Sequence, residues 1–345
     1  MAYTTIDKPT DYFNTVLYTG NGSTGHAITG VGFQPDLVWL KCRPQARNHR
    51  WIDIIRGVGK HLESDNTDAE ESPADGLTAF GSDGFTVGNT GGYNNSSENF
   101  VAWNWLASNT TASNSDGSIT STVSANQTAG FSIVSYTGTS STATVGHGLA
   151  VTPSMIIVKN RSATQNWIVY HQAIGNTGAL YLNATNATDT ASGWFNNTSP
   201  TSSVFTVGTY DAINGSSHNL IAYCFAEKKG YSKFGSYTGN GSSNGSYIHL
   251  GYKPSFVMVR DPNNAENWLM YDNKRPGFNL TNNHLMANTT DVEVASTANT
   301  MDLLSGGFKI RSTNNGLNRS GGTFLYMAFA ESPFVSSSGI PTTAR

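Results

Sequence analysis

The sequence predicts an all-β protein made of three tandem β-sandwich-like repeats of about 100 residues each, with a short N-terminal arm and a C-terminal tail. Three observations predict this class: a composition poor in helix formers, a repeated Tyr-Thr-Gly element, and apolar runs that recur in one register. Gly, Ser, Thr and Asn make up 43% of the 345 residues, and charged residues make up only 12%. Because turn formers and strand-compatible residues dominate, helices are disfavoured. The net charge of −3 and the aromatic content of 11% argue against disorder.

The Tyr-Thr-Gly element opens each repeat, at Tyr18, Tyr136 and Tyr237. A proline lies 17 residues after each tyrosine and is followed by four apolar residues and a base. These runs are 37–41 (LVWLK), 155–159 (MIIVK) and 256–260 (FVMVR). Runs of four apolar residues predict strands that are buried on both faces.

Further elements recur after each apolar run. Each repeat has a tryptophan, then a Phe-centred strand, and closes with the hexamers 100–105 (FVAWNW), 220–225 (LIAYCF) and 324–329 (FLYMAF). We expect the strand tryptophans in the core. They are Trp39, Trp51, Trp103, Trp105, Trp167 and Trp268.

The repeats imply six segments. We expect an arm at 1–12, repeats at 13–108, 131–230 and 231–334, a Ser/Thr/Asn-rich linker at 109–130, and a tail at 335–345. The linker is low in apolar residues, and at most one edge strand is expected in it, at 118–123. We expect no membrane insertion and no signal peptide, because the chain has neither a long apolar run nor a basic segment followed by an apolar one.

Two short motifs resemble catalytic or cofactor signatures, and we interpret both as turns. Residues 20–25 match GxGxxG and residues 241–245 match GxSxG. Both signatures need a helix directly after the turn, and neither segment continues with a helical period. The eight histidines show no close ligand spacing, so we assign no catalytic, cofactor-binding or metal-binding residue.

The charged residues leave two alternatives open. Lys41, Lys159 and Arg260 end the same strand in the three repeats, either as structural bases at the sheet rim or as a repeated site for an anionic ligand. The acidic stretch 63–71 is either a solvated insertion loop or a weak cation site near Asp65 and Asp68. The net charge of −3 and the pI of about 6.2 predict no binding to nucleic acid.

Three aromatic residues lie in polar loops: Tyr93, Trp194 and Tyr210. Such side chains either pack locally or stack on the rings of sugars. We carry them forward as candidate ligand-binding residues.

Several segments resemble a family of uncharacterised, repeat-containing virion structural or tail-fibre-like proteins of marine tailed phages, of the cyanophage and pelagiphage type. The resemblance is carried by 1–25 (MAYTTIDKPTDYFNTVLYTGNGSTG), 225–230 (FAEKKG), 231–241 (YSKFGSYTGNG) and 326–334 (YMAFAESPF). It spans nearly the whole chain and supplies no catalytic residues. It implies a virion protein made in the host cytoplasm, assembled as a homotrimer and attached to other virion proteins through the N-terminal arm.

From these observations we expect a tail fibre or receptor-binding component that adheres to host surface polysaccharide. Neutral polar loops would supply many weak hydrogen bonds, and several copies would add avidity. The alternatives are a capsid decoration or tail connector protein without a ligand, and a polysaccharide depolymerase. We expect neither enzymatic activity nor a cofactor.

Overall fold

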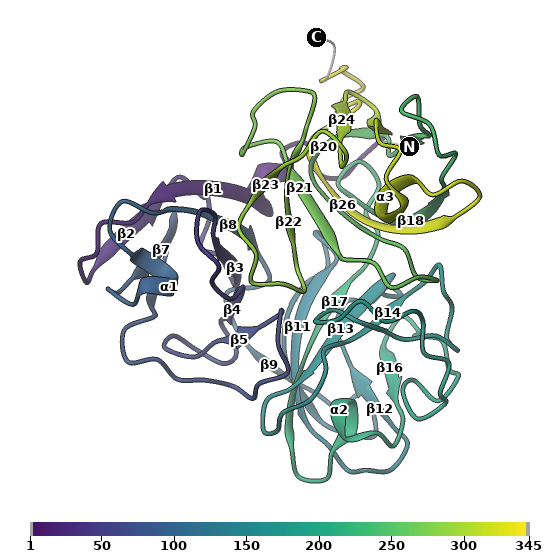
Figure 1. Ribbon diagram of the computed structural model, residues 1–345. Coiled ribbons are helices and arrows are strands. Elements are labelled where there is room, and N and C mark those ends of the chain that lie inside the picture. The colour runs from purple at the N-terminus through teal and green to yellow at the C-terminus, as the bar shows by residue number, and fades with distance from the viewer. Residues whose placement is uncertain (1–2, 343–345) are drawn as a thin grey trace.

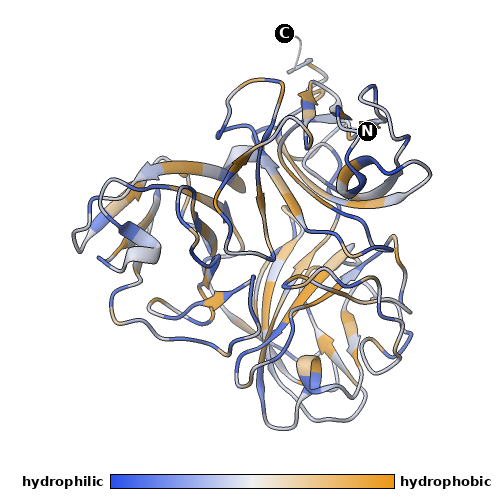
Figure 2. Ribbon diagram, viewed as in Figure 1, coloured by the Kyte–Doolittle hydropathy of each residue, from blue (hydrophilic) through white to orange (hydrophobic). Residues whose placement is uncertain are grey.

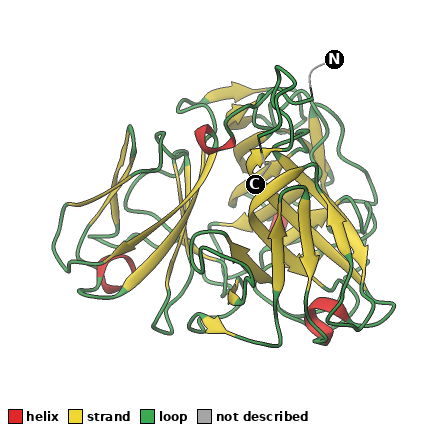
Figure 3. Cartoon of the chain, turned by 90° about the horizontal axis from the view of Figure 1, so that it is seen from above, coloured by secondary structure: helices red, strands yellow, loops and turns green. Residues whose placement is uncertain are grey.

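A computed structural model describes residues 3–342 of the chain. Strands account for 41% of the residues and helices for 4%, which confirms the all-β class. The chain folds into three units around a common centre, coloured purple to blue, teal, and green to yellow in Figure 1. Figure 3 shows the short helices among the loops at the strand ends. None of the helices in residues 3–342 has the length and apolar character needed to cross a membrane.

The first unit has a large sheet with strand order β1-β8-β3-β4-β5 and a small sheet with order β2-β7-β6. Neighbouring strands are antiparallel. Its elements are the 3-10 helix η1 (Pro9–Asp11), β1 (Phe13–Thr19), β2 (His26–Thr29), β3 (Leu37–Cys42), β4 (Arg50–Asp53), β5 (Leu62–Glu63), β6 (Leu77–Gly81), β7 (Gly84–Val87), α1 (Gly91–Asn94) and β8 (Asn99–Trp105).

The second unit repeats this order as β11-β17-β13-β14-β15 and extends it beyond β11 by β10 and β9, while β12 and β16 form its small sheet. Its elements are β9 (Ala112–Asn114), β10 (Ser121–Asn126), β11 (Phe131–Thr137), β12 (Ala143–Gly146), β13 (Met155–Asn160), β14 (Ile168–His171), β15 (Leu180–Tyr181), β16 (Val204–Val207), α2 (Asp211–Asn214) and β17 (Asn219–Phe225).

The segment 109–130 is therefore not a linker, as we expected, but contributes two strands to the second unit. Strand β10 pairs with β11 from Thr122 opposite Ser135 to Asn126 opposite Phe131. An added strand satisfies the backbone groups of β11 on its open side. Few apolar residues are needed for this, and Val123 supplies one of them to the core of the unit.

The third unit has the large-sheet order β18-β26-β20-β21-β22-β23 and the small-sheet order β19-β25-β24. Its elements are β18 (Ser232–Thr238), β19 (Tyr247–His249), β20 (Tyr252–Arg260), β21 (Leu269–Asp272), β22 (Asn283–Met286), β23 (Val294–Ala295), β24 (Met301–Leu304), β25 (Gly307–Ile310), α3 (Asn315–Asn318) and β26 (Thr323–Pro333). The first five strands of its large sheet again follow the order found in the first unit.

Each large sheet is covered on both faces, as the apolar runs predict. Every residue of β3 and of β13 is buried. Leu37 and Trp39 face a central core shared by all three units, whereas Val38 and Leu40 face the core inside the first unit. The six strand tryptophans are at most 2% exposed, which confirms their expected place. In Figure 2 the hydrophobic residues lie mainly on the strands and the hydrophilic ones in the outer loops.

Equivalent aromatic residues from the three units meet at the centre of the molecule. Trp105, Phe225 and Phe329 stand near the ends of the three hexamer strands. Their ring centroids are 6.2 Å apart for Trp105 and Phe225, 5.7 Å for Trp105 and Phe329, and 6.1 Å for Phe225 and Phe329. This nearly equilateral triangle marks an approximate three-fold axis within one chain.

The three recurring bases join neighbouring units. Lys41 donates to the carbonyl of Thr290 at 2.8 Å, Lys159 to that of Thr67 at 2.9 Å, and Arg260 to that of Asn186 at 2.6 Å. Each base also donates to a carbonyl six residues further along its own chain segment, at Arg47, Gln165 and Glu266.

These bases are therefore buried ties between units and are not snorkelling side chains at a sheet rim. Lys41, Lys159 and Arg260 are all fully buried, so they offer no surface for an anionic ligand. Burial lowers the pKa of Lys41 to about 8 and that of Lys159 to about 7.

Side chains two residues beyond the ties strengthen two of the three unit interfaces. Arg43 makes two hydrogen bonds to Glu293, at 3.0 and 2.8 Å, and Arg161 makes two to Glu70, at 2.8 and 3.0 Å. At the third interface Thr188 donates through its amide and its hydroxyl to the carbonyl of Pro262, both at 2.8 Å.

The Tyr-Thr-Gly element is held in the same way in each unit. The hydroxyl of its tyrosine donates to the carbonyl of Tyr93, Ile213 or Leu317, at 2.5 to 2.6 Å. The following residue, Asn94, Asn214 or Asn318, is fully buried and hydrogen-bonds the turn after the element. The segments 20–25 and 241–245 are such turns, and each is followed by a strand.

The N-terminal arm and the C-terminal tail are packed against the third unit and against each other. The hydroxyl of Tyr3 donates to the carbonyl of Gly251 at 2.7 Å, and Ile6 is 2% exposed in the central core. Ser337 donates its amide to Asp7. The arm expected at 1–12 is thus part of the folded body over residues 3–12, while residues 1–2 and 343–345 lie outside the described residues.

Candidate functional site

Tyr93 is not available to a ligand, and its assignment as a ligand-binding residue is wrong. It lies on α1 and is 1% exposed. Its hydroxyl is 2.9 Å from Nδ1 of His61, and the guanidinium of Arg50 lies 5.0 Å from its ring centroid. The residues before the buried asparagine in the other units, Ile213 and Leu317, are equally buried. Alignment of the three repeats therefore shows that the position of Tyr93 faces inward in every unit.

Trp194 and Tyr210, by contrast, are brought together. Their ring centroids are 4.5 Å apart in an edge-to-face arrangement. Together with Gln165, Thr209 and Asp211 they line an open depression on the second unit. Trp194 is only 8% exposed and Tyr210 is 41% exposed. Only the tyrosine therefore presents much surface to a ligand.

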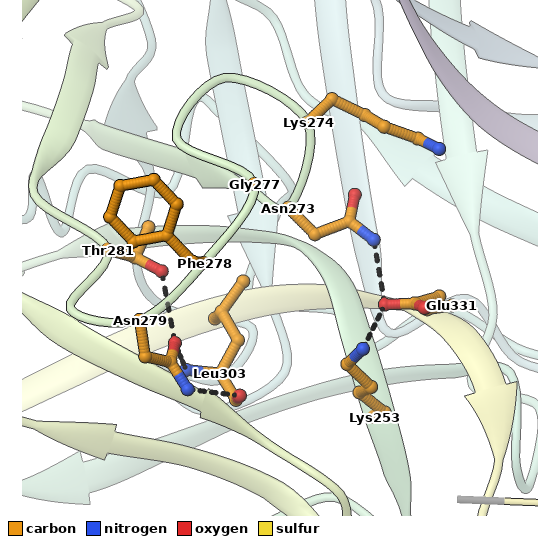
Figure 4. A pocket seen from close by; sticks show the side chains of 9 residues that line it. All are labelled: Lys253, Asn273, Lys274, Gly277, Phe278, Asn279, Thr281, Leu303 and Glu331. Carbon is orange, nitrogen blue, oxygen red and sulfur yellow. Dashed lines mark hydrogen bonds and ion pairs between the residues drawn. The ribbon is translucent and has the colours of Figure 1, made fainter. Parts of the chain in front are cut away.

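A more enclosed pocket of about 250 Å³ lies on the third unit, in a region where the sequence predicted no site (Figure 4). It is formed by the loop between β21 and β22 together with β20, β24 and β26. The lining residues are Lys253, Asn273, Lys274, Gly277, Phe278, Asn279, Thr281, Leu303 and Glu331. Phe278 is 75% exposed, so its ring offers an apolar surface beside these polar groups.

The polar groups of this pocket are held in place by one another. Glu331 pairs with Lys253 at 2.9 Å and accepts a hydrogen bond from Nδ2 of Asn273 at 2.8 Å, as the dashed lines of Figure 4 show. The side chain of Asn279 donates to the carbonyl of Leu303 and accepts its amide, both at 2.9 Å, which fixes the loop that carries Phe278. Oδ1 of Asn273 is buried and has no hydrogen-bond partner.

This arrangement is suited to binding a neutral, hydroxyl-rich ligand. An exposed ring supplies a stacking surface, and an ammonium, a carboxylate and amides supply donors and acceptors around it. Glu331 is the one carboxylate among the residues that line the pocket. Hydrolysis of a glycosidic bond ordinarily requires a pair of carboxyl groups flanking the bond, and this lining supplies one.

Asp65 and Asp68, in the acidic stretch 63–71, do not belong to the group of side chains that could hold a metal ion. Asp65 accepts the amide of His49 at 2.6 Å, and burial raises the pKa of its carboxyl to about 7, whereas Asp68 is exposed. Among the described residues, His61, Glu63 and Glu71 each offer one potential ligand atom, and these three atoms lie within 4.8 Å of one another. Sequence inspection missed this set because its members are two and eight residues apart and meet only through a β-bridge between His61 and Glu71.

Comparison with known proteins identifies the extent of the domain. A family model described as "Domain of unknown function (DUF7483)" matches residues 8–333. This range covers all three units together with η1. None of the curated proteins compared with the chain matches it.

Proposed function

The chain belongs to the DUF7483 family, whose domain spans all three units, and on this premise we propose that it is a non-enzymatic structural protein of a phage particle that binds surface polysaccharide. The observation that carries the binding role is the pocket of the third unit, where a highly exposed Phe278 and paired polar groups line the same cavity. The sequence resemblance described above supports the assignment of the protein to a phage particle.

The architecture supports a structural role. Three units share one core, buried bases tie each unit to the next, and ion pairs strengthen two of the three interfaces. Such a body holds its outer loops in fixed relative positions, which preserves a preformed binding surface and lowers the entropy cost of binding. Low charge also makes attraction to a polysaccharide less sensitive to salt.

Binding is tested on an array of bacterial surface glycans with the labelled full-length protein. We expect Phe278→Ala to weaken binding by at least about tenfold, the loss typical of a central aromatic contact. Phe334→Ala is the matched control, because Phe334 is also exposed, at 43%, but does not line the pocket. Tyr210→Ala tests the depression on the second unit.

Four outcomes distinguish the possibilities. Loss with Phe278→Ala alone supports the pocket, and loss with Tyr210→Ala alone moves the site to the second unit. No binding by the wild-type protein to any glycan would overturn the adhesion role and leave a capsid decoration or tail connector protein. Release of new reducing ends from a bound polysaccharide would instead indicate a depolymerase.

Location and assembly are tested on particles that carry this chain. Electron cryomicroscopy that finds it at the tail periphery supports adhesion, and density on the capsid lattice contradicts it. The homotrimer suggested by the resemblance stays a prediction, which light scattering on the purified protein measures. Because residues 3–12 are packed on the body, attachment to other virion proteins would use the outer surface rather than a free arm.

A further inference from the structure

We propose that His61, Glu63 and Glu71 form a binding site for a divalent transition-metal ion, with Zn²⁺ as the best match. This site lies on the first unit and is independent of the pocket to which we assign polysaccharide binding. The ligand set of one imidazole and two carboxylates is one that zinc accepts, with a water molecule to complete four-fold coordination.

The spacing of the ligand atoms fits such an ion. Nε2 of His61 lies 3.4 Å from Oε1 of Glu63 and 3.3 Å from Oε2 of Glu71. Zinc bonds of about 2.0–2.2 Å arranged tetrahedrally separate neighbouring ligand atoms by roughly 3.3–3.5 Å. The imidazole is therefore spaced from each carboxylate as two ligands of one ion are, and all three ligand atoms lie within 4.8 Å of one another.

His61 is held with a free nitrogen facing the carboxylates. Its side chain is 3% exposed, and Nε2 has no hydrogen-bond partner although it is buried. Its other nitrogen, Nδ1, lies 2.9 Å from the hydroxyl of Tyr93. When Nδ1 donates its proton to that hydroxyl oxygen, the lone pair of Nε2 points to the ion, which is the arrangement that outer partners impose on metal-binding histidines.

The charges nearby favour a cation. Arg50 lies 3.2 Å from Oε1 of Glu63 and is the one competing cation that the structure shows at this oxygen. Two carboxylates and one guanidinium leave one formal negative charge beside the imidazole.

The second unit provides an internal comparison. There Ala179 and Asp189 form the same β-bridge as His61 and Glu71, and Tyr181 stands where the first unit has Glu63. The hydroxyl of Tyr181 donates directly to Asp189 at 2.7 Å. A hydrogen bond thus closes the loop of the second unit, whereas the first unit has three metal-binding side chains in the corresponding place.

A bound ion would stiffen the loop that the first unit extends to the second. His61 and Glu71 exchange two backbone hydrogen bonds of 3.0 Å at the base of this loop. Between them, Thr67 accepts the tie from Lys159, and Glu70 pairs with Arg161. Metal binding at the base would therefore stabilise the interface between the two units.

The site is tested with the full-length protein after treatment with EDTA. Calorimetric titration with ZnCl₂ measures affinity, and titration with CoCl₂ reports coordination through the visible absorption of tetrahedral Co²⁺. The test variants are His61→Gln and Glu71→Gln, and the second is safe for folding because the Glu71 side chain is 55% exposed. Asp68→Asn is the matched control, since it removes an exposed carboxylate from the same loop.

We expect one Zn²⁺ per chain, an intense Co²⁺ band, and at least about a tenfold loss of affinity in both test variants. Asp68→Asn should change the affinity less than about twofold, and Tyr93→Phe should weaken it by about tenfold or more through the orientation of His61. Binding that is equal in the wild type and both test variants would overturn the proposal. So would equal loss in Asp68→Asn, which would indicate diffuse attraction by the loop.

Discussion

Replacement of Phe329 by alanine tests whether the three units share one core. The Phe329 side chain is 1% exposed at the approximate three-fold axis. Its ring lies within 6.5 Å, centroid to centroid, of aromatic rings from all three units. These are Phe13, Trp105, Phe225, Tyr231, Phe234 and Phe256.

The expected loss of stability is large. Truncation of a buried phenylalanine costs about 3–5 kcal/mol through lost transfer energy and the cavity that remains. Favourable aromatic pairs add about 0.5–1.5 kcal/mol each, although such terms do not sum fully. We therefore expect a decrease of about 4–5 kcal/mol in the free energy of unfolding, a substantial part of a typical total of about 5–15 kcal/mol.

Urea unfolding followed by tryptophan fluorescence and circular dichroism measures this loss. The tryptophans report on every unit: four lie in the first, Trp167 and Trp194 in the second, and Trp268 in the third. Because the core is shared, all probes should follow one transition, and its midpoint should fall in the variant. Phe334→Ala, at an exposed position, should change the stability by less than about 0.5 kcal/mol.

Two results would refute this reasoning. A loss below about 2 kcal/mol would mean that the site collapses around the missing ring and that the centre is not tightly packed. A fluorescence transition that separates from the circular dichroism transition in the wild type would mean that the units unfold independently.

Three further predictions concern the contacts that join and shape the units. Arg161→Ala should lower the free energy of unfolding by about 1–3 kcal/mol, because the largely buried Glu70 loses two hydrogen bonds and keeps the longer contacts with Arg56 and Lys60, at 3.6 and 3.7 Å; a double-mutant cycle with Glu70→Ala that gives no coupling would contradict this. Since burial lowers the pKa of Lys159 to about 7, the unfolded chain binds more protons than the folded one between about pH 7 and 10.5, so stability should rise with pH in this window. Lys159→Met should flatten that rise in urea midpoints measured at several pH values, and an unchanged slope would be evidence against it. Asn214→Ala should cost at least about 1–3 kcal/mol in thermal or urea unfolding, because the amide of Thr139 and two carbonyls lose their partner; a neutral effect would show that water replaces the side chain.

The pattern of apolar residues within short segments correctly predicted the buried central strands. The apolar run 155–159 has four consecutive apolar residues, and the strand it predicts, β13, is buried along its whole length. The same reasoning failed for 109–130, because strands added at the side of a sheet need few apolar residues when the strand beside them supplies the hydrogen bonds. It also misplaced Tyr93, because a polar neighbourhood in the sequence does not reveal which way a side chain points.

The sequence by itself determined the all-β class, the recurring strands and the burial of both faces of the central strands, because these follow from composition and from periodicities of a few residues. Only the tertiary structure decided which face of each strand meets which core. It also decided that Lys159 reaches the carbonyl of Thr67, 92 positions away, and that His61, Glu63 and Glu71 converge. The physical reason is that these contacts depend on how whole sheets pack around a common axis, and that packing is set by the sum of many burial terms that no short segment encodes.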